Sequence, residues 1–288
     1  MVATGERAWH AGTHRLVRRQ SPLLMGIVNV TPDSFSDGGR FLDAAAAVRH
    51  GLRLVEDGAD LLDVGGESSR PGASPVPVEE ELRRVLPVLR ELRQQTRVPL
   101  SVDTTKAAVA RAALAEGAEV VNDISGLRFD AEMLPLLAGS DCGVVLMHMQ
   151  GTPRTMQVAP HYEDVVRDVG SWLEQRCDAL AAAGIAPERL ALDPGLGFGK
   201  RFPDNLRLLR HLDALRGQGR PLLVGASRKS FLGWLLAEPE PLARAEGDLA
   251  LCAWCRQTGV EFVRVHDVRA ARRMFRILDA LDGDSIVT

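Results

Sequence analysis

The chain has 288 residues, of which 45% are hydrophobic, and this is enough to bury the core of one large domain. Its 35 lysines and arginines against 38 acidic residues leave a net charge of −3, so no overall positive field would concentrate a nucleic acid. Its apolar runs are far shorter than the roughly 20 residues that a membrane helix needs, and its basic N-terminus lacks the apolar stretch of a secretory signal. We therefore expect a cytoplasmic protein that binds neither nucleic acid nor membranes and holds any anionic ligand with a local group of side chains.

The four cysteines, Cys142, Cys177, Cys252 and Cys255, are too few and too scattered for a disulfide framework in a chain of this length. Cys252 and Cys255 form a C-x-x-C pair, but they lie in an apolar segment with helical periodicity, and no second ligand pair is close in the sequence. We therefore expect buried core thiols rather than structural zinc or redox chemistry.

Short runs rich in valine, isoleucine and leucine recur along the chain, and a longer stretch with helical periodicity follows each of them. In chain order, the runs that predict strands cover residues 23–30, 61–65, 100–103, 119–123, 143–148, 190–193, 222–225 and 262–265. The stretches that predict helices cover residues 43–58, 78–93, 105–117, 162–184, 203–217, 242–259 and 268–281. Near-continuous apolar strands alternating with helices indicate a parallel sheet covered by helices, and eight such units close into an α/β (β/α)8 TIM barrel.

The barrel is expected to occupy residues 22–283, between a short N-terminal arm or hairpin at 1–21 and a tail at 284–288. We expect the arm, which carries Trp9, to close the floor of the barrel. An open doubly wound sheet is the alternative architecture, but its G-x-G-x-x-G fingerprint is absent from residues 26–39. The barrel is therefore favoured.

Polar side chains end nearly every predicted strand, at the face where barrel enzymes build their active sites. Some could have a purely local role, since Asp103 could cap a helix and Asp193 could open a turn before Pro194. A ring of such groups in a closed barrel is nevertheless costly unless a polar ligand pairs with it, so we predict a polar ligand there. The ring comprises Asn29, Asp63, Asp103, Asn122, Asp123, His148, Asp193, residues 227–230, Arg264 and His266.

Two long glycine-rich loops, at residues 29–39 and 65–72, could fold over this ligand. Arg70 offers a planar fork for a phosphate or carboxylate. Asp33 and Asp37 are available for a metal ion or for a positively charged reaction centre.

Arg264 and His266 lie two positions apart at the end of one predicted strand, so both point the same way and would present two cationic donors to an anion. Together with Asn29 and Arg70, they predict a bound diphosphate accompanied by Mg2+. The carboxylates nearby are few, so the magnesium would be held mainly through phosphate oxygens and water.

Two further motifs look like ligand sites but favour a structural role. Residues 195–200 resemble a phosphate loop, yet they are one residue short of G-x-x-x-x-G-K and are followed by Arg201 instead of serine or threonine. Met147, His148 and Met149 could indicate a soft-metal cluster, but methionines at a strand end more often pack against a flat ligand or the core, as we expect here.

Over about residues 24–281, nearly the whole chain, the sequence resembles the dihydropteroate synthases. The resemblance is carried by MGIVNVTPDSFSDGG at 25–39, DVGGESSRPG at 63–72, NDISG at 122–126, MHMQGTP at 147–153, DPGLGFGK at 193–200, SRKS at 227–230 and RVH at 264–266. Position 69 is a mild departure, because serine stands where threonine is frequent in the family.

The resemblance implies a transferase that joins p-aminobenzoate to 6-hydroxymethyl-7,8-dihydropterin diphosphate, with Asn29 contacting the magnesium. The implied pterin ligands are Asp103, Asn122, Met147, Asp193, Gly225 and Lys229, and the implied diphosphate ligands are Asn29, Arg70, Arg264 and His266. The implied p-aminobenzoate site consists of Ser69, Arg70, Pro71, Phe198, Lys229 and Ser230. The implied catalytic group is Asn29, Asp33, Asp37, Arg70, Lys229, Arg264 and His266.

The chemistry of these residues agrees with the implied roles. A pterin edge carries adjacent N–H donors beside acceptors, so Asp193 can take the donor pair while Asn122 and Lys229 serve other atoms. The resemblance further implies attack by the aniline nitrogen on the pterin methylene carbon, and our hypothesis is that diphosphate leaves early. It also suggests inhibition by sulfonamides and a homodimer with an interface around Trp254 and Phe275.

Two other functions would use a similar barrel. A pterin-binding methyltransferase barrel would share acidic and amide pterin ligands, but it has no use for the diphosphate loops at 29–39 and 65–72. A non-catalytic pterin-binding paralogue would need no intact catalytic group, yet Asn29, Arg70 and Lys229 are all present.

Overall fold

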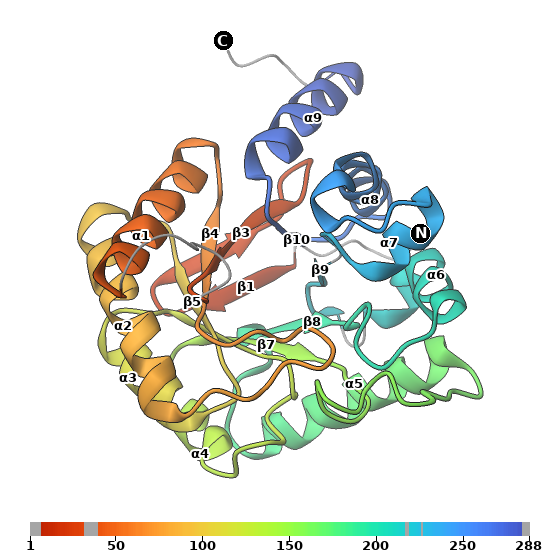
Figure 1. The fold of residues 1–288 in the computed structure, drawn as a ribbon. Coiled ribbons are helices and arrows are strands. Elements are labelled where there is room, and N and C mark those ends of the chain that lie inside the picture. The colour runs from red at the N-terminus through yellow and green to blue at the C-terminus, as the bar shows by residue number, and fades with distance from the viewer. Residues whose placement is uncertain (1–6, 32–39, 217–218, 226, 284–288) are drawn as a thin grey trace.

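The computed structural model describes residues 7–31, 40–216, 219–225 and 227–283. Eight parallel strands pair in the order β8-β7-β6-β5-β4-β3-β10-β9 (Figure 1). A parallel bridge between Leu192 and Leu222 joins the two ends of this sheet, so the ring is nearly closed. The strands are β3 Leu23–Asn29, β4 Leu61–Gly65, β5 Leu100–Asp103, β6 Val120–Asp123, β7 Gly143–Met147, β8 Leu190–Asp193, β9 Leu223–Gly225 and β10 Phe262–Val265. The expected TIM barrel is confirmed.

Helices lie on the outside of the ring of strands (Figure 1). They are α1 Arg40–Glu56, α2 Val78–Gln95, α3 Ala107–Ala115, α4 Met133–Ala138, α5 Val165–Ala182, α6 Phe202–Arg210, α7 Ser230–Leu236, α8 Ala245–Gln257 and α9 Val268–Leu281, with short 3-10 turns at Pro187–Arg189, Leu212–Leu215 and Pro241–Ala243. Leucine and valine side chains from these helices and from the outer face of the strands form the main core. Burial of such apolar area is the main force that holds the barrel together.

Two helices were missed by the sequence analysis, and one expected helix is broken. The helices α4 and α7 have only 6 and 7 residues, which is too short for a helical period to stand out. The stretch expected to be helical at 203–217 divides into α6 and the 3-10 turn Leu212–Leu215. These differences concern helices outside the ring of strands, and the strand ends that carry the predicted polar ring are unchanged.

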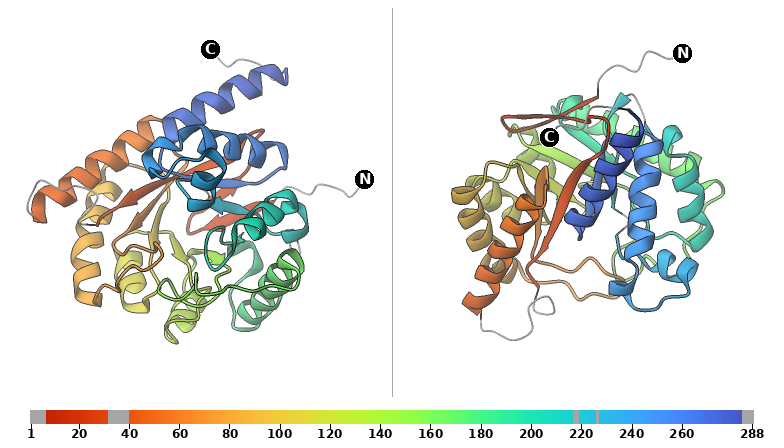
Figure 2. Two further views of the ribbon diagram at one scale, coloured as in Figure 1. Left: turned by 45° about the vertical axis from the view of Figure 1, so that its right-hand side comes forward. Right: turned by 90° about the horizontal axis from the view of Figure 1, so that it is seen from above.

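The hairpin of β1 Ala8–Ala11 and β2 His14–Val17 lies across one end of the barrel (Figure 2, right). Trp9 is 0% exposed, packs edge-on against Phe262 with ring centroids 5.1 Å apart, and donates its indole N–H to the carbonyl of Arg189. A second apolar cluster joins Trp9 to residues from seven strands of the barrel, among them Met25 and Leu61. The hairpin that we expected is therefore present, and it closes the end of the barrel opposite to the polar strand ends.

The four cysteines are free and buried, as expected, and Cys252 and Cys255 lie on α8. Within the part of the chain that the structure describes, no group of three His, Cys, Asp or Glu side chains could hold a metal ion. No helix among these residues is long and apolar enough to cross a membrane.

Candidate active site

Asp63 on β4 is the centre of a buried polar network at the strand ends. Its side chain is 0% exposed, and it accepts hydrogen bonds from Ser101 Oγ at 2.6 Å, Asn122 Nδ2 at 3.0 Å and Arg264 Nε at 2.6 Å. Arg264 also donates from Nη2 to Asp103 Oδ2 at 2.9 Å. One guanidinium group therefore bridges two carboxylates, and the network joins β4, β5, β6 and β10. Asp63 belongs to the polar ring predicted from the sequence, although no role for it was predicted.

The Asp103 carboxyl group has an unusual protonation equilibrium. Burial and the neighbouring carboxylate of Asp63 together raise its pKa to about 7, although the guanidinium group of Arg264 opposes the shift. Near neutral pH, this group can therefore either accept or donate a hydrogen bond.

Asp193, at the end of β8, is the second buried carboxylate of the site. Its Oδ1 accepts the Gly195 N–H at 2.7 Å. Its pKa is raised to about 6, because burial outweighs the lowering effects of this hydrogen bond and of the ammonium group of Lys229. A Cβ atom at Gly225 would lie 3.8 Å from Asp193 Oδ2 and 3.7 Å from Arg264 Cβ, so the glycine leaves that volume open. Asp193 can therefore present its Oδ2 to a ligand.

Lys229 lies between the two sides of the candidate site. Its ammonium nitrogen is 4.0 Å from the centroid of the Phe198 ring, a cation–π contact. Burial lowers the pKa of Lys229 to about 8 in spite of the opposing charge of Asp193. The structure thus brings Asp193, Phe198 and Lys229 together, as both the pterin and the p-aminobenzoate assignments require.

An apolar surface accompanies these charged groups. Met147 and Phe198 belong to one buried cluster with Ile124, Met149 and Met156. The methionines therefore pack, as we expected from the sequence. Thioether and aromatic groups of this kind suit a flat ring system.

His148 and Lys200 are linked to each other, and Lys200 is hydrogen-bonded to the loop that carries Phe198. Lys200 Nζ contacts His148 Nδ1 at 3.0 Å and donates to the carbonyls of Phe198 at 3.0 Å and His148 at 3.3 Å. Burial lowers the pKa of His148 to about 2, so its imidazole is neutral. Lys200 therefore anchors the loop that carries Phe198, which accounts for the glycine-rich motif without a phosphate.

His266 follows β10, and its Nδ1 lies 3.0 Å from Ser227 Oγ. Burial lowers the pKa of His266 to about 2, and the cationic groups of Arg228, Arg264, Arg70 and Lys229 contribute to this shift. The sequence predicted two cationic donors at this strand end. In the structure the imidazole is neutral, and the Arg264 guanidinium is paired with two carboxylates.

The loop between β4 and α2, which carries Ser69, Arg70 and Pro71, is anchored at both ends. Glu67 accepts hydrogen bonds from Lys106 Nζ and from the Val76 N–H, and the Gly72 N–H donates to the carbonyl of Pro153. Arg70 is exposed at the tip of this loop.

The remaining predicted site residues lie at a strand end, at a helix start or outside the described part of the chain. Asn29 ends β3, half-buried, and pairs with Gly65 in the sheet. Ser230 is exposed at the first position of α7. Asp33 and Asp37 lie outside the described residues.

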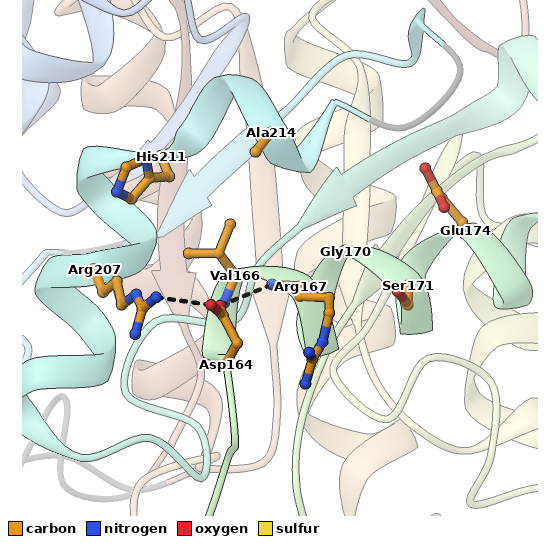
Figure 3. A pocket seen from close by; sticks show the side chains of 9 residues that line it. All are labelled: Asp164, Val166, Arg167, Gly170, Ser171, Glu174, Arg207, His211 and Ala214. Atoms are coloured by element: carbon orange, nitrogen blue, oxygen red, sulfur yellow. Dashed lines mark hydrogen bonds and ion pairs between the residues drawn. The ribbon is translucent and has the colours of Figure 1, made fainter.

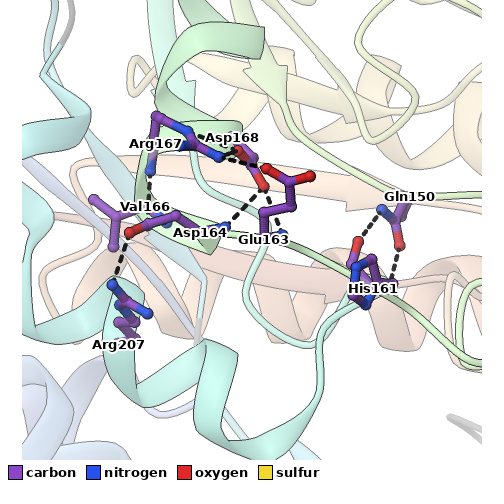
Figure 4. Close-up of polar contacts among 8 residues, drawn as sticks. All are labelled: Gln150, His161, Glu163, Asp164, Val166, Arg167, Asp168 and Arg207. Carbon is purple, nitrogen blue, oxygen red and sulfur yellow. Dashed lines mark hydrogen bonds and ion pairs between the residues drawn. The ribbon is translucent and has the colours of Figure 1, made fainter.

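A surface groove between α5 and α6 is a separate feature on the outside of the barrel (Figure 3). Its charged groups are occupied locally: Asp164 caps α5 and accepts from Arg207 Nη2 at 2.7 Å, and Arg167 pairs with Glu163 (Figure 4). Nearby, Gln150 Nε2 donates to the carbonyl of His161. The groove therefore lacks the convergent buried groups of the strand ends.

The sequence model of the pterin-binding enzyme family matches residues 25–266. A dihydropteroate synthase from Synechocystis is 45% identical over 258 residues, which cover 90% of this chain and 89% of that protein. This chain belongs to the dihydropteroate synthase family. It is therefore an enzyme, a transferase, built on a pterin-binding barrel.

Solved structures of dihydropteroate synthases match the fold closely. The structure from Xanthomonas albilineans with 4-aminobenzoic acid has a TM-score of 0.90 and 48% identity, and the match covers 98% of this chain and 100% of that one. The structure from Yersinia pestis with a sulfonamide drug complex has a TM-score of 0.88 and 43% identity, with 96% and 99% covered.

Proposed function

We propose that this enzyme condenses 6-hydroxymethyl-7,8-dihydropterin diphosphate with p-aminobenzoate, giving 7,8-dihydropteroate and diphosphate. The observation that carries the proposal is the convergence of Asp193, Lys229 and Phe198 at the strand ends, where a buried carboxylate and a half-buried ammonium group lie beside an aromatic face. The complex of the Xanthomonas albilineans relative with 4-aminobenzoic acid supports the second substrate.

The hydrogen bonds that the site residues already make support the proposed pterin contacts. Asp193 keeps Oδ2 for the donor pair of the pterin edge, because the Gly195 N–H takes Oδ1. Asn122 donates one N–H to Asp63, so its carbonyl oxygen and its second N–H remain for the pterin ring. Asp103, with a pKa of about 7, can accept from a ring N–H or donate to a ring nitrogen. Met147 would pack on the ring face.

The diphosphate would be held by Asn29, Arg70, Arg264 and His266. Arg264 uses two of its five N–H groups in its bonds to Asp63 and Asp103, so the other three remain for phosphate oxygens. Arg70 can close on the leaving group from the loop after β4.

Magnesium fits this donor set in one way only. Asn29 supplies an amide oxygen at the strand end, and the described residues hold no cluster of three acidic or imidazole ligands. A hard cation that takes most of its ligands from phosphate oxygens and water meets this condition. When bound, Mg2+ would neutralise charge on the diphosphate, with Asn29 as its protein ligand.

The reaction needs no covalent nucleophile. The aniline nitrogen forms a bond to the pterin methylene carbon, the carbon–oxygen bond to diphosphate breaks, and the nitrogen loses a proton. We propose that diphosphate leaves early, since the electron-rich dihydropterin can delocalise a developing cation and Arg264 stabilises the departing charge. The loop of Ser69, Arg70 and Pro71 would then exclude water from that cation.

Two experiments test these steps. Incubation with both substrates and Mg2+, with mass detection of dihydropteroate, tests the overall reaction. A non-catalytic paralogue would bind the pterin and form no product. Positional isotope exchange within the diphosphate in the absence of p-aminobenzoate tests its early departure, and a complete lack of exchange beside a normal turnover rate would count against that order.

We also propose a homodimer. Large apolar side chains are exposed on α7 and α9, with Trp234 76%, Ile277 63% and Leu281 77% exposed. Phe275, which the sequence analysis placed near the interface, is 1% exposed and belongs to the core, so it cannot contact a partner. Sedimentation equilibrium of the wild type and of Ile277→Glu tests whether this surface associates.

A further inference from the structure

Asp248 on α8 is linked to His266 through one hydroxyl group. Ser227 Oγ donates to Asp248 Oδ2 at 2.6 Å, and His266 Nδ1 lies 3.0 Å from the same Ser227 Oγ. The second carboxylate oxygen, Oδ1, accepts the Arg228 N–H at 2.8 Å. The chain therefore runs from α8 through the loop after β9 to the end of β10.

The loop that carries Ser227 is held from a second side by the same helix. Arg244, the residue at the start of α8, donates from Nη1 to the carbonyls of Arg228 at 3.1 Å and Lys229 at 3.2 Å. Arg228 has a positive φ of 60°, a conformation that a residue other than glycine adopts only when its surroundings impose it. Ser227 is thus fixed relative to both Asp248 and Lys229.

The direction of each hydrogen bond follows from the number of protons available. A carboxylate only accepts, so the single hydroxyl proton of Ser227 is directed to Asp248. Ser227 Oγ must then accept from His266, which requires the imidazole proton to be on Nδ1. Nε2 of the neutral ring then carries a lone pair and no proton.

We propose that Asp248, acting through Ser227, is a positioning residue that holds the His266 proton on Nδ1, so that the imidazole must take up a second proton, on Nε2, to bind an anionic phosphate group. The part that concerns phosphate rests on the function proposed above. The tautomer itself rests only on the three hydrogen bonds.

The cationic groups around His266 explain why its imidazole takes up the second proton only when an anion binds. Arg70, Arg228, Lys229 and Arg264 face the imidazole from the loop after β4, the loop after β9 and β10, and with burial they lower its pKa to about 2. Of the acidic groups, Asp248 lies beyond Ser227, while Asp267 and Asp248 act on Arg228. A diphosphate brings several negative charges, so it raises the pKa of His266.

Replacing Asp248 by asparagine should reverse the direction of the hydrogen bonds that link position 248, Ser227 and His266. The amide oxygen of Asp248→Asn stays on the Arg228 N–H, which places its NH2 group opposite Ser227 Oγ. The hydroxyl proton must then turn toward His266 Nδ1, and the imidazole proton moves to Nε2. Ser227→Thr keeps the hydroxyl and is the matched control.

Nitrogen NMR of 15N-histidine-labelled protein shows which imidazole nitrogen of His266 carries the proton. The His266 signals are identified by their loss in His266→Gln. We expect the Nδ1–H tautomer in the wild type and in Ser227→Thr, and the Nε2–H tautomer in Asp248→Asn. Thermal unfolding monitored by circular dichroism verifies that each variant is folded. An Nε2–H tautomer in the folded wild type, or an unchanged tautomer in folded Asp248→Asn, overturns the positioning role.

Calorimetric titration with inorganic diphosphate and Mg2+ in two buffers of different ionisation enthalpy measures proton uptake. We expect the wild type to take up about one proton more than Asp248→Asn, whose Nε2–H can donate without further protonation. Because the imidazolium pKa is higher in the complex, the wild-type affinity should fall about tenfold per pH unit above that pKa, relative to Asp248→Asn at the same pH. Equal proton uptake by the wild type and by Asp248→Asn overturns the proposed link between the His266 tautomer and phosphate binding. A wild type that does not bind diphosphate overturns the proposed diphosphate site as well, while the NMR result still decides the positioning role.

Discussion

The Nε of Arg264 donates to Oδ2 of Asp63 at 2.6 Å, and this ion pair joins β10 to β4 across the strand β3 that separates them. The carboxylate is fully buried and takes two further hydrogen bonds from Ser101 and Asn122. Asp63 therefore orients both Arg264 and Asn122 in the candidate site without needing to touch a substrate.

Asp63→Asn should destabilise the protein by about 3 kcal/mol, because removing one partner of a buried ion pair leaves the other charge poorly compensated. Chemical denaturation measures this loss. Asp282→Asn is the control, since Asp282 pairs with Arg256 on the surface and such pairs contribute roughly 0–1 kcal/mol. Equal stability of the two variants would show that Asp63 does not support the network.

Lys229→Ala should lower kcat/KM by about one to two decades, since an unpaired pterin acceptor in a dry site costs roughly 1–3 kcal/mol. The loss should exceed that of a surface cation, because the Lys229 ammonium group lies over the Phe198 ring and interacts electrostatically with Asp193. Steady-state kinetics of Lys229→Ala beside Arg210→Ala, an exposed residue of α6, makes the comparison. Wild-type efficiency in Lys229→Ala would remove this residue from the site.

Asp193→Asn should abolish tight pterin binding and still leave a folded protein. The amide oxygen keeps the Gly195 N–H, so the NH2 group faces the pterin donor pair and repulsion replaces attraction. Isothermal calorimetry with the pterin measures the loss, with Asp213→Asn in the exposed 3-10 turn as control. Unchanged pterin affinity in the folded variant would refute the donor-pair assignment.

The same substitution has a defined effect on stability against pH. Burial raises the folded-state pKa of Asp193 from 3.8 to about 6, so ionisation opposes folding, and this group's contribution is present below pH 3.8 and lost as the pH rises through 6. Asp193→Asn should therefore be more stable than the wild type at pH 8 by about 1–3 kcal/mol, with the difference shrinking toward pH 4. Denaturation curves at several pH values would disprove this if the difference were constant.

Sulfonamides should inhibit competitively with p-aminobenzoate. They copy its aniline and place a sulfonyl group where its carboxylate would sit, and no insertion at 68–72 or 227–231 reshapes the pocket against a longer tail. The Yersinia pestis relative was solved with a sulfonamide drug complex. Rates at several p-aminobenzoate concentrations decide the matter, and turnover that is insensitive to millimolar drug would mean a different pocket.

The eight strands and most of the helices could be predicted because burial of apolar side chains leaves a pattern in the local sequence. The prediction at 61–65 coincides with β4 because a strand buried on both faces is a nearly continuous apolar run, whereas α7, with 7 residues, is too short to show a helical period. The motif resemblance likewise indicated Asp193, Phe198 and Lys229, although Lys229 lies 36 positions after Asp193 in the chain.

Tertiary packing alone decided which polar groups face one another and in what charge state. The sequence placed Asp63 at a strand end, but only the closed ring brings Arg264, Ser101 and Asn122 to its oxygens. The imidazole of His266 looked cationic in sequence, and burial beside four cations makes it neutral. Hydrogen-bond partners and desolvation depend on residues far apart in the chain, and no local pattern records them.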